Sequence, residues 1–373
     1  MPKRALPRLI IADSERDADM LYATRFFVPD AFLLLDQDGR RTIALSDLEV
    51  DRGRDAARVD EVISITEELK RLGLRKTTPY GIFAGRFLRS RKVRRALVPG
   101  TFPTAMAHAL AREGVSVVPA KGLFYEDRIR KSEAELKLLR QAMAISEAGL
   151  ARATEVLRAA EIGPKAALRW SGRPLTSELL RAEIDSAVLR AGGLPANTIV
   201  AGGTQACDPH ERGSGPLRGN ELIILDIFPR SARSGYWGDM TRTVLRGRAS
   251  DAQRHLWETV CAGQKMVLSA MKAGAEGKKI HESVKKFFKE QGFPTEQHEG
   301  RWRGFFHGTG HGLGLELHEE PRFGKTVMQV GQVLTVEPGI YWPGVGGARQ
   351  EDVAAVTQDG VRVLSKFPKV LEL

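Results

Sequence analysis

Two aspartates in the second half of the chain stand where a carboxylate is unusual. Asp226 ends the apolar run LIILD, and Asp239 follows the segment GYWG a short distance later. An unpaired carboxylate on a buried strand is costly, so such a residue usually has a cation, a metal ion or a group of donors beside it. A hairpin between the two segments would bring Asp239 back beside Asp226. The pair is therefore a candidate cation site, although a single buried aspartate is more often held by donors than by a metal.

The glycine-rich stretch HGTGHGLGLELHEEP, residues 307–321, contributes His307, His311 and His318. Its glycines disfavour a helix, and a helical zinc motif also needs glutamate directly after the first histidine, so this is not such a motif. A dinucleotide-binding loop is equally poor, because no strand leads into the stretch and no helix follows at once. One histidine is more often structural than ligating, whereas three so close together favour a functional role.

Two glutamates complete the set, Glu337 in LTVEPGIY and Glu351 in GARQEDVAAV. Each could instead be a rim residue or half of an ion pair, with Arg349 as the nearby partner for Glu351. Together with the two aspartates and one imidazole, they form a mostly oxygen ligand set that suits manganese, cobalt, iron or zinc better than a closed thiolate site would. Four carboxylates balance the charge of two divalent ions, whereas a single ion leaves excess negative charge.

These segments, taken in order, resemble the motifs of the pita-bread metallopeptidases, the family of methionine aminopeptidase, aminopeptidase P and prolidase. The resemblance covers roughly residues 130–365. The metal ligands of that family follow the order Asp, Asp, His, Glu, Glu, which falls here on Asp226, Asp239, His311, Glu337 and Glu351. The resemblance implies two divalent ions, manganese before cobalt, zinc or iron. It also implies that Asp239 and Glu351 bridge the ions, that Asp226 holds one, and that His311 and Glu337 hold the other.

Three more histidines match positions that line the substrate site in the aminopeptidase P and prolidase branch: His210 in GGTQACDPHERGS, His307 and His318. Their implied roles are to position the scissile carbonyl and to stabilise charge in the tetrahedral intermediate, with Glu337 moving the proton. A supporting or packing role for His307 stays open. The family usually places about eleven residues between its aspartates and this chain has a longer hairpin, but a lengthening by two keeps the same side chains on one face, because strand periodicity is two.

Two domains are expected to position these residues, since a chain of 373 residues exceeds the length at which one core grows efficiently. Apolar runs such as LIIA, AFLLL, YGIFAG and VSVVPA alternate with amphipathic segments over residues 1–125, which predicts an α/β domain. Residues 126–373 twice show two helices followed by antiparallel strands, with the first helix over 131–160, which predicts a pseudo-symmetric α+β domain. The first domain resembles the creatinase-type domain and the second the pita-bread catalytic domain.

The implied function is a dinuclear-metal exopeptidase that hydrolyses the bond between an N-terminal residue and proline, with a peptide carrying proline at its second position as the substrate. Whether it is an Xaa-Pro aminopeptidase or an Xaa-Pro dipeptidase stays open. An arginine that reaches the carboxylate of a terminal proline would favour dipeptides, and Arg349 and Arg212 are the candidates. The resemblance also implies a homodimer.

The alternative is a non-catalytic binding protein on the same scaffold, associated with nucleic acid through a basic surface. The net charge of +11 and the segment GRFLRSRKVRR, residues 85–95, keep that alternative open. We nevertheless expect no nucleic acid, because no aromatic stacking pattern or nucleic-acid motif accompanies the charge. Only two cysteines, Cys207 and Cys261, and no apolar stretch of membrane-spanning length are found, so we expect a cytoplasmic protein without a membrane span.

Overall fold

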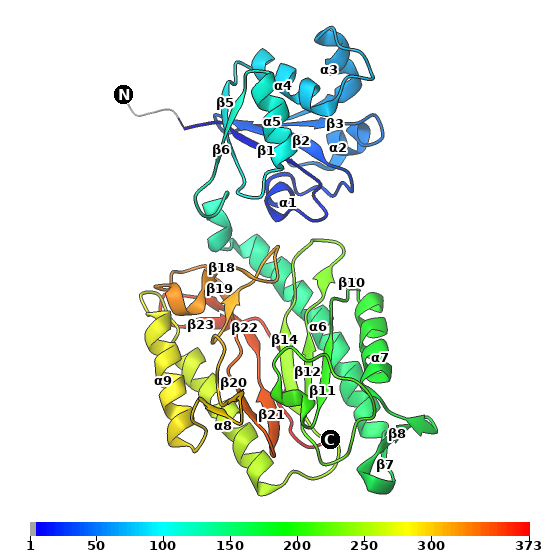
Figure 1. Cartoon of the computed structure of the whole chain (residues 1–373), viewed down its shortest axis with the longest axis vertical. Helices are drawn as coiled ribbons and strands as arrows, with labels where there is room; N and C mark the ends of the chain where they lie inside the picture. The colour runs from blue at the N-terminus through cyan, green and yellow to red at the C-terminus, as the bar shows by residue number, and fades with distance from the viewer. Residues whose placement is uncertain (1–4) are drawn as a thin grey trace. The chain divides into compact units, whose positions relative to one another are not determined.

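The computed structural model describes residues 5–373, whose contacts divide the chain into two compact units (Figure 1). The first unit extends to Glu126 and the second comprises Asp127–Leu373. The boundary expected from the sequence lies between residues 125 and 126.

The first unit is built on a mixed six-stranded sheet with the strand order β4-β3-β2-β1-β5-β6. Strands β1 and β2, and β2 and β3, pair antiparallel, whereas the other three pairs are parallel. The strands are β1 (Arg8–Ala12), β2 (Phe32–Gln37), β3 (Arg40–Leu45), β4 (Glu61–Ser64), β5 (Arg95–Val98) and β6 (Ser116–Pro119).

Helices cover both faces of this sheet. They are α1 (Ala18–Thr24), α2 (Val50–Ala56), α3 (Ile65–Arg71), α4 (Tyr80–Ser90) and α5 (Thr104–Arg112). One apolar cluster includes Phe83 and Phe87 of α4, and a second includes Met20 of α1 and Val50 of α2. The expectation of a strand in YGIFAG is wrong, because this segment begins α4. Phe83 and Phe87 lie four residues apart on one helical face, and a short apolar run alone does not separate a strand from a buried helix.

The basic segment 85–95 runs from α4 into β5 and is partly neutralised by acidic side chains. Arg86 Nε lies 2.7 Å from Glu113, and Arg91 Nη2 lies 2.9 Å from Glu61. The structure therefore accounts for part of this charge by ion pairs within the first unit.

Four helices dominate the second unit: α6 (Glu133–Ala159), α7 (Ser177–Arg190), α8 (Asp251–Ala270) and α9 (Gly277–Glu290). Ser132 and Ser250 cap α6 and α8 through complete capping boxes, and Thr176 caps α7. These are the helices expected from the sequence. No helix among residues 5–373 is both long and apolar enough to span a membrane.

An antiparallel sheet follows each pair of helices along the chain, the first after α6 and α7 and the second after α8 and α9. The first has the order β11-β12-β14 and the second the order β18-β17-β19-β22-β23, with β20 and β21 pairing separately. The strands are β11 (Ile199–Gly202), β12 (Ile223–Ile227), β14 (Met240–Val244), β17 (His311–Gly312), β18 (Glu319–Arg322), β19 (Val333–Val336), β20 (Gly339–Trp342), β21 (Gly346–Arg349), β22 (Asp352–Val356) and β23 (Val361–Val363). Two helices followed by antiparallel strands, twice, confirm the predicted pseudo-symmetric α+β fold.

Shorter strands complete the second unit. They are β7 (Glu161–Ile162), β8 (Leu168–Trp170), β9 (Arg173–Pro174), β10 (Gly193–Leu194), β13 (Arg230–Ser231), β15 (Glu296–His298) and β16 (Arg301–Arg303). Helix α6 lies close to the first sheet at Gly149, where an added Cβ would meet Ile227 at 3.2 Å. Helices α8 and α9 pack on the second sheet through an apolar cluster that includes Val260, Val284 and Leu334. These apolar contacts hold the helices against the two sheets. The polar residues at the strand ends can then form a site.

Candidate metal centre

The register of β12 and β14 places the two aspartates on one face of the first sheet. Asp226 pairs with Thr241 and Ile227 with Met240 in the antiparallel ladder. Asp239 precedes Thr241 by two residues, so its side chain points to the same face as Thr241 and Asp226. The predicted hairpin is therefore present despite its length.

The second sheet brings the two glutamates together in the same way. Val336 of β19 pairs with Asp352 of β22, so Glu337 and Glu351 occupy the next opposed positions of this ladder. Glu351 also joins the sheets, because its backbone N–H donates to Thr241 O at 3.1 Å and its carboxylate accepts from Thr241 Oγ1 at 2.8 Å.

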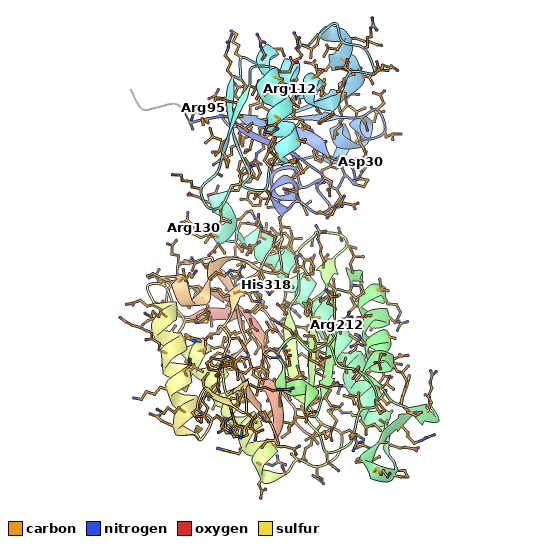
Figure 2. All side chains as sticks on the ribbon, viewed as in Figure 1. Asp30, Arg95, Arg112, Arg130, Arg212 and His318 are labelled. Carbon is orange, nitrogen blue, oxygen red and sulfur yellow. The ribbon has the colours of Figure 1, made fainter. Side chains whose placement is uncertain are left out.

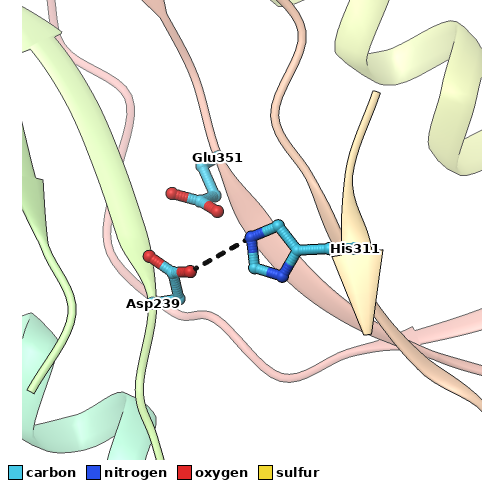
Figure 3. A group of neighbouring side chains, drawn as sticks. All are labelled: Asp239, His311 and Glu351. Carbon is cyan, nitrogen blue, oxygen red and sulfur yellow. Dashed lines mark ion pairs between the residues drawn. The ribbon is translucent and has the colours of Figure 1, made fainter. Parts of the chain in front are cut away.

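His311 faces these carboxylates from β17 (Figure 3). Its Nε2 lies 3.6 Å from Asp239 Oδ2 and 3.4 Å from Glu337 Oε1, while its Nδ1 donates to Gly312 O at 3.1 Å. The bond at Nδ1 leaves the Nε2 lone pair facing the acids, which is how a ligating histidine is held. Single ligand atoms of Asp239, His311 and Glu351 all lie within 4.8 Å of one another.

These acids and the imidazole have strongly shifted proton affinities. Burial, followed by repulsion from Glu351, raises the pKa of Asp239 well above its usual range, and burial with repulsion from Glu337 does the same to the pKa of Glu351. Burial raises the pKa of Glu337 to about 7 and lowers the pKa of His311 to about 4. The imidazole is therefore neutral near pH 7 and brings no positive charge to the carboxylates.

Asp226 pairs with Arg349, which the sequence analysis gave as a candidate partner of Glu351. Arg349 Nη2 donates to Asp226 Oδ2 at 2.6 Å and Arg349 Nη1 donates to Tyr341 Oη at 2.9 Å. The suggestion that Arg349 pairs with Glu351 is wrong. Asp226 Oδ1 is buried and has no hydrogen-bond partner among the described residues, so one oxygen of this carboxylate stays available to a cation.

The other histidines lie around this cluster. His307 Nε2 is 2.9 Å from Tyr341 Oη, and burial lowers the pKa of His307 to about 3. The ring of His318 meets that of His311 edge to face with centroids 4.3 Å apart, and burial lowers its pKa to about 4. His210 enters from the loop before β12, where its backbone N–H donates to Asp208 at 3.1 Å.

All eight predicted site residues line one cavity of about 920 Å³. Apolar walls come from Ile199, Phe228 and Phe306, and the basic side chains of Arg322 and Lys325 lie at the same cavity. Arg212, named from the sequence as a candidate for substrate binding, is exposed and is not among its lining residues (Figure 2).

Sequence reasoning missed Arg322 and Tyr341 as members of this site. Arg322 lines the same cavity and pairs with His311 across β17 and β18, and its positive charge lowers the pKa values of both His311 and His318, after the larger effect of burial. Arg322 directly follows the glycine-rich stretch 307–321, and Tyr341 follows Glu337 by four residues. Proximity to the motifs was thus the signal, but only the fold shows that Arg322 pairs with His311 across the strands and that Tyr341 bonds to Arg349 and His307.

Comparison with known proteins agrees with this geometry. The sequence profile of metallopeptidase family M24 matches residues 137–358, which is more than half of the chain. The chain belongs to metallopeptidase family M24.

Curated relatives of this M24 chain include two proteins named Xaa-Pro dipeptidase. One, from Pyrococcus furiosus, is 34% identical over 179 residues, which cover 47% of this chain and 49% of that protein. The other, from Pyrococcus horikoshii, is 27% identical over 318 residues, 84% of this chain and 78% of that protein. A crystal structure described as an X-Pro aminopeptidase from Thermotoga maritima superposes with a TM-score of 0.83 at 21% identity, covering 98% of this chain and 97% of that one. The last likeness shows that the whole two-unit fold is shared.

Family M24 membership implies divalent metal ions, and the residues present fit them. The cavity holds carboxylates whose burial and mutual repulsion favour a counter-charge, an orphaned buried oxygen of Asp226, and a neutral imidazole with Nε2 directed at the acids. Oxygen donors with one imidazole suit hard or borderline divalent cations. This chain therefore carries a candidate divalent-metal centre in its second unit.

Proposed function

We propose that this M24 metallopeptidase is an exopeptidase that cleaves the bond between an N-terminal residue and proline, using two divalent ions. The observation that supports the proposal most is the group of the buried Asp239 and Glu351 and the partly buried Glu337 around His311 in a single cavity. The names of the Pyrococcus relatives and of the Thermotoga structure supply the proline specificity.

The proposed ligands, which would hold the ions, are Asp226, Asp239, His311, Glu337 and Glu351. Bound ions would polarise the scissile carbonyl and lower the pKa of a water molecule. Glu337, whose pKa burial raises to about 7, can accept a proton from the nucleophile and pass it to the leaving nitrogen. The proposed metal is manganese, with cobalt, zinc and iron as alternatives.

The histidines of the cavity are proposed to position the substrate. His210 and His318 line the cavity. Each can donate one N–H to a substrate carbonyl or to the negative charge that develops on it. His307 is fixed by its hydrogen bond with Tyr341, whose hydroxyl accepts from Arg349. The contribution of His307 is therefore to hold the hydrogen-bonded chain of Tyr341 and Arg349 beside Asp226.

Arg322 is the candidate for the substrate's own carboxylate. It is exposed, lines the cavity and lies close enough to His311 and His318 to lower their pKa values, whereas Arg349 is already engaged by Asp226. An arginine can grip a terminal carboxylate with two parallel hydrogen bonds. This placement favours an Xaa-Pro dipeptidase over an aminopeptidase that acts on longer chains.

A direct test compares alanyl-proline with alanyl-prolyl-alanine amide in the presence of manganese. We expect hydrolysis of the dipeptide to be preferred, and Arg322→Gln to reduce kcat/KM for the dipeptide far more than for the amide. Equal losses on both peptides would remove Arg322 from carboxylate recognition while leaving the peptidase activity in place.

Replacement of Glu337 by Gln tests the chemistry itself. Turnover should be abolished, because an amide cannot accept the proton. Substantial activity in this variant with both ions still bound would refute the role of Glu337. Elemental analysis measures the metal content. The molar mass in solution should be that of a homodimer, which is the oligomeric state that we propose.

The proposal also includes a cytoplasmic homodimer that binds the peptide substrate and no nucleic acid. Cys207 and Cys261 are both unpaired, and the arginines Arg86 and Arg91 of the basic segment form ion pairs. Free thiols suit a reducing compartment.

A further inference from the structure

The loop between β17 and β18, residues 313–318, determines where His318 lies. It begins next to the proposed ligand His311 and ends at Glu319, which pairs with Gly312 across the two strands. Leu317 and His318 both line the cavity. The position of the His318 ring therefore depends on what holds this loop.

One residue of the hairpin between the two aspartates donates two hydrogen bonds to the loop. The backbone N–H of Trp237 donates to Gly314 O at 2.9 Å, and its indole Nε1 donates to Leu315 O at 3.1 Å. Two adjacent carbonyls of the loop are thus held by one side of the hairpin, three residues before His318.

The hairpin is itself anchored at this point. Tyr236 Oη donates to Glu135 Oε1 of α6 at 2.7 Å, and the N–H of Gly238 donates to Pro229 O at 2.9 Å. Gly238 lies so close to α6 that an added Cβ would meet Ala142 O at 2.5 Å. Trp237 stands between these two fixed residues, so it offers its donors from a rigid position.

The far end of the loop is held by charge. Glu319 is 4% exposed and accepts from Arg128 Nη2 at 2.8 Å and from Lys131 Nζ at 2.5 Å. Arg128 also reaches Glu316, within the loop, at 2.6 Å. Since this ion cluster holds Glu316 and Glu319 on either side of His318, Trp237 is the complementary support for the start of the loop, at Gly314 and Leu315.

We propose that Trp237 is a positioning residue for His318. Its hydrogen bonds to Gly314 and Leu315 keep the loop 313–318 in place, so that the His318 ring stays edge-on against His311 and faces the cavity. The hairpin 227–238 thereby serves the site twice, by returning Asp239 beside Asp226 and by holding the loop that carries a substrate-facing imidazole. The kinetic consequence rests on the proposed peptidase function, whereas the effect on the loop does not.

Trp237→Phe removes the indole donor and keeps an aromatic ring. Trp257→Phe is a matched control, because Trp257 Nε1 also donates to a backbone carbonyl, Thr243 O at 2.9 Å, from helix α8. With manganese and alanyl-proline, we expect Trp237→Phe to lower kcat/KM about fivefold, the effect of one hydrogen bond, and the control to leave it unchanged. The affinity for manganese should be the same in both variants and in the parent.

A double-mutant cycle distinguishes positioning from general destabilisation. If Trp237 acts through His318, then Trp237→Phe combined with His318→Ala should be no less active than His318→Ala alone. Additive losses would overturn the proposal, and so would a loss of manganese affinity in Trp237→Phe that matches its loss of activity.

Hydrogen exchange provides a readout that needs no activity. Backbone amides of residues 313–318 should exchange faster in Trp237→Phe than in the parent or in Trp257→Phe, because the loop loses one of its supports. Unchanged exchange in this segment would overturn the proposal. If the parent failed to hydrolyse any Xaa-Pro peptide, the proposed function would fall, and this exchange experiment would still decide whether Trp237 holds the loop.

Discussion

The second unit buries acidic side chains in two neighbouring places with opposite electrostatic results. Glu319 is paired with both Arg128 and Lys131, whereas the cavity cluster of Asp239, Glu337 and Glu351 contains more carboxylates than cations. A buried acid that is paired with cationic side chains is a structural element. A buried group of acids with too few cationic side chains is a site that can bind a positive ligand. The number of cations within reach, and not burial alone, separates the two.

The contrast is visible even between adjacent residues. Glu351, directly before β22, faces the cavity, while Asp352, the first residue of that strand, accepts from Arg242 at 2.8 Å and from Lys369 at 2.6 Å. Successive side chains of a strand point to opposite faces, so one step along β22 separates a candidate metal ligand from a neutralised structural acid.

The largest expected effect is in the cavity cluster. Asp239→Asn keeps the shape of the side chain but removes its charge, and it should reduce manganese affinity and peptidase activity by more than about a hundredfold, since loss of an outer partner of a ligand already costs about ten- to a hundredfold. Isothermal titration and a peptide assay measure both quantities.

The same substitution should not destabilise the metal-free protein. Burial and repulsion from Glu351 disfavour the charged form of Asp239, so an amide at this position relieves repulsion. A fall in the urea midpoint of the metal-free variant would contradict our description of this cluster as one that lacks counter-charge.

The next largest effect is in the paired cluster. Glu319→Gln leaves the buried Lys131 without a carboxylate and Arg128 with only the half-exposed Glu316, which should lower the free energy of unfolding by about 3 kcal/mol. Urea unfolding of the metal-free protein measures this loss. Adding Lys131→Met, which removes the stranded ammonium, should restore part of it, and a further loss would argue against the pairing as its cause.

The sequence was sufficient to predict the four main helices and the paired strands of the second unit and eight of the residues that line the cavity, because periodicity and ordered motifs are local signals. Asp226 and Asp239 were expected on one face, and the register of β12 and β14 shows that they are. Partners distant in the chain were not predictable. Arg128 and Lys131 lie far before Glu319, and nothing in RQED shows that Arg349 pairs with Asp226 while Asp352 pairs with Arg242. Such choices depend on which strands meet, which only the fold determines.

A pH dependence of stability should follow from Glu337 in protein freed of metal with a chelator. The pKa of Glu337 is about 7 in the folded protein and ordinarily 4.5, so between these values the folded state binds more protons than the unfolded state. Stability therefore falls as pH rises through this window, by about 3 kcal/mol for this group.

The difference between the parent and Glu337→Gln isolates this contribution from other titrating groups. The parent should lose more stability than the variant between pH 4.5 and 7. Saturating manganese should remove the loss, because metal binding requires the deprotonated carboxylates and therefore strengthens as pH rises. A parent and variant with parallel pH profiles would show that Glu337 is not held in an unfavourable environment.

The smallest effect is expected at an acid that has a cation but no burial. Glu133, at the start of α6, accepts from Arg362 at 2.6 Å, yet the two side chains are 70% and 49% exposed. Water and salt screen such a pair, so Glu133→Gln should shift the urea midpoint far less than Glu319→Gln. If the two substitutions lowered the urea midpoint equally, the cost at Glu319 could not come from leaving buried cations unpaired. Burial combined with pairing would then not be what distinguishes a neutralised structural acid from an acid that binds a ligand.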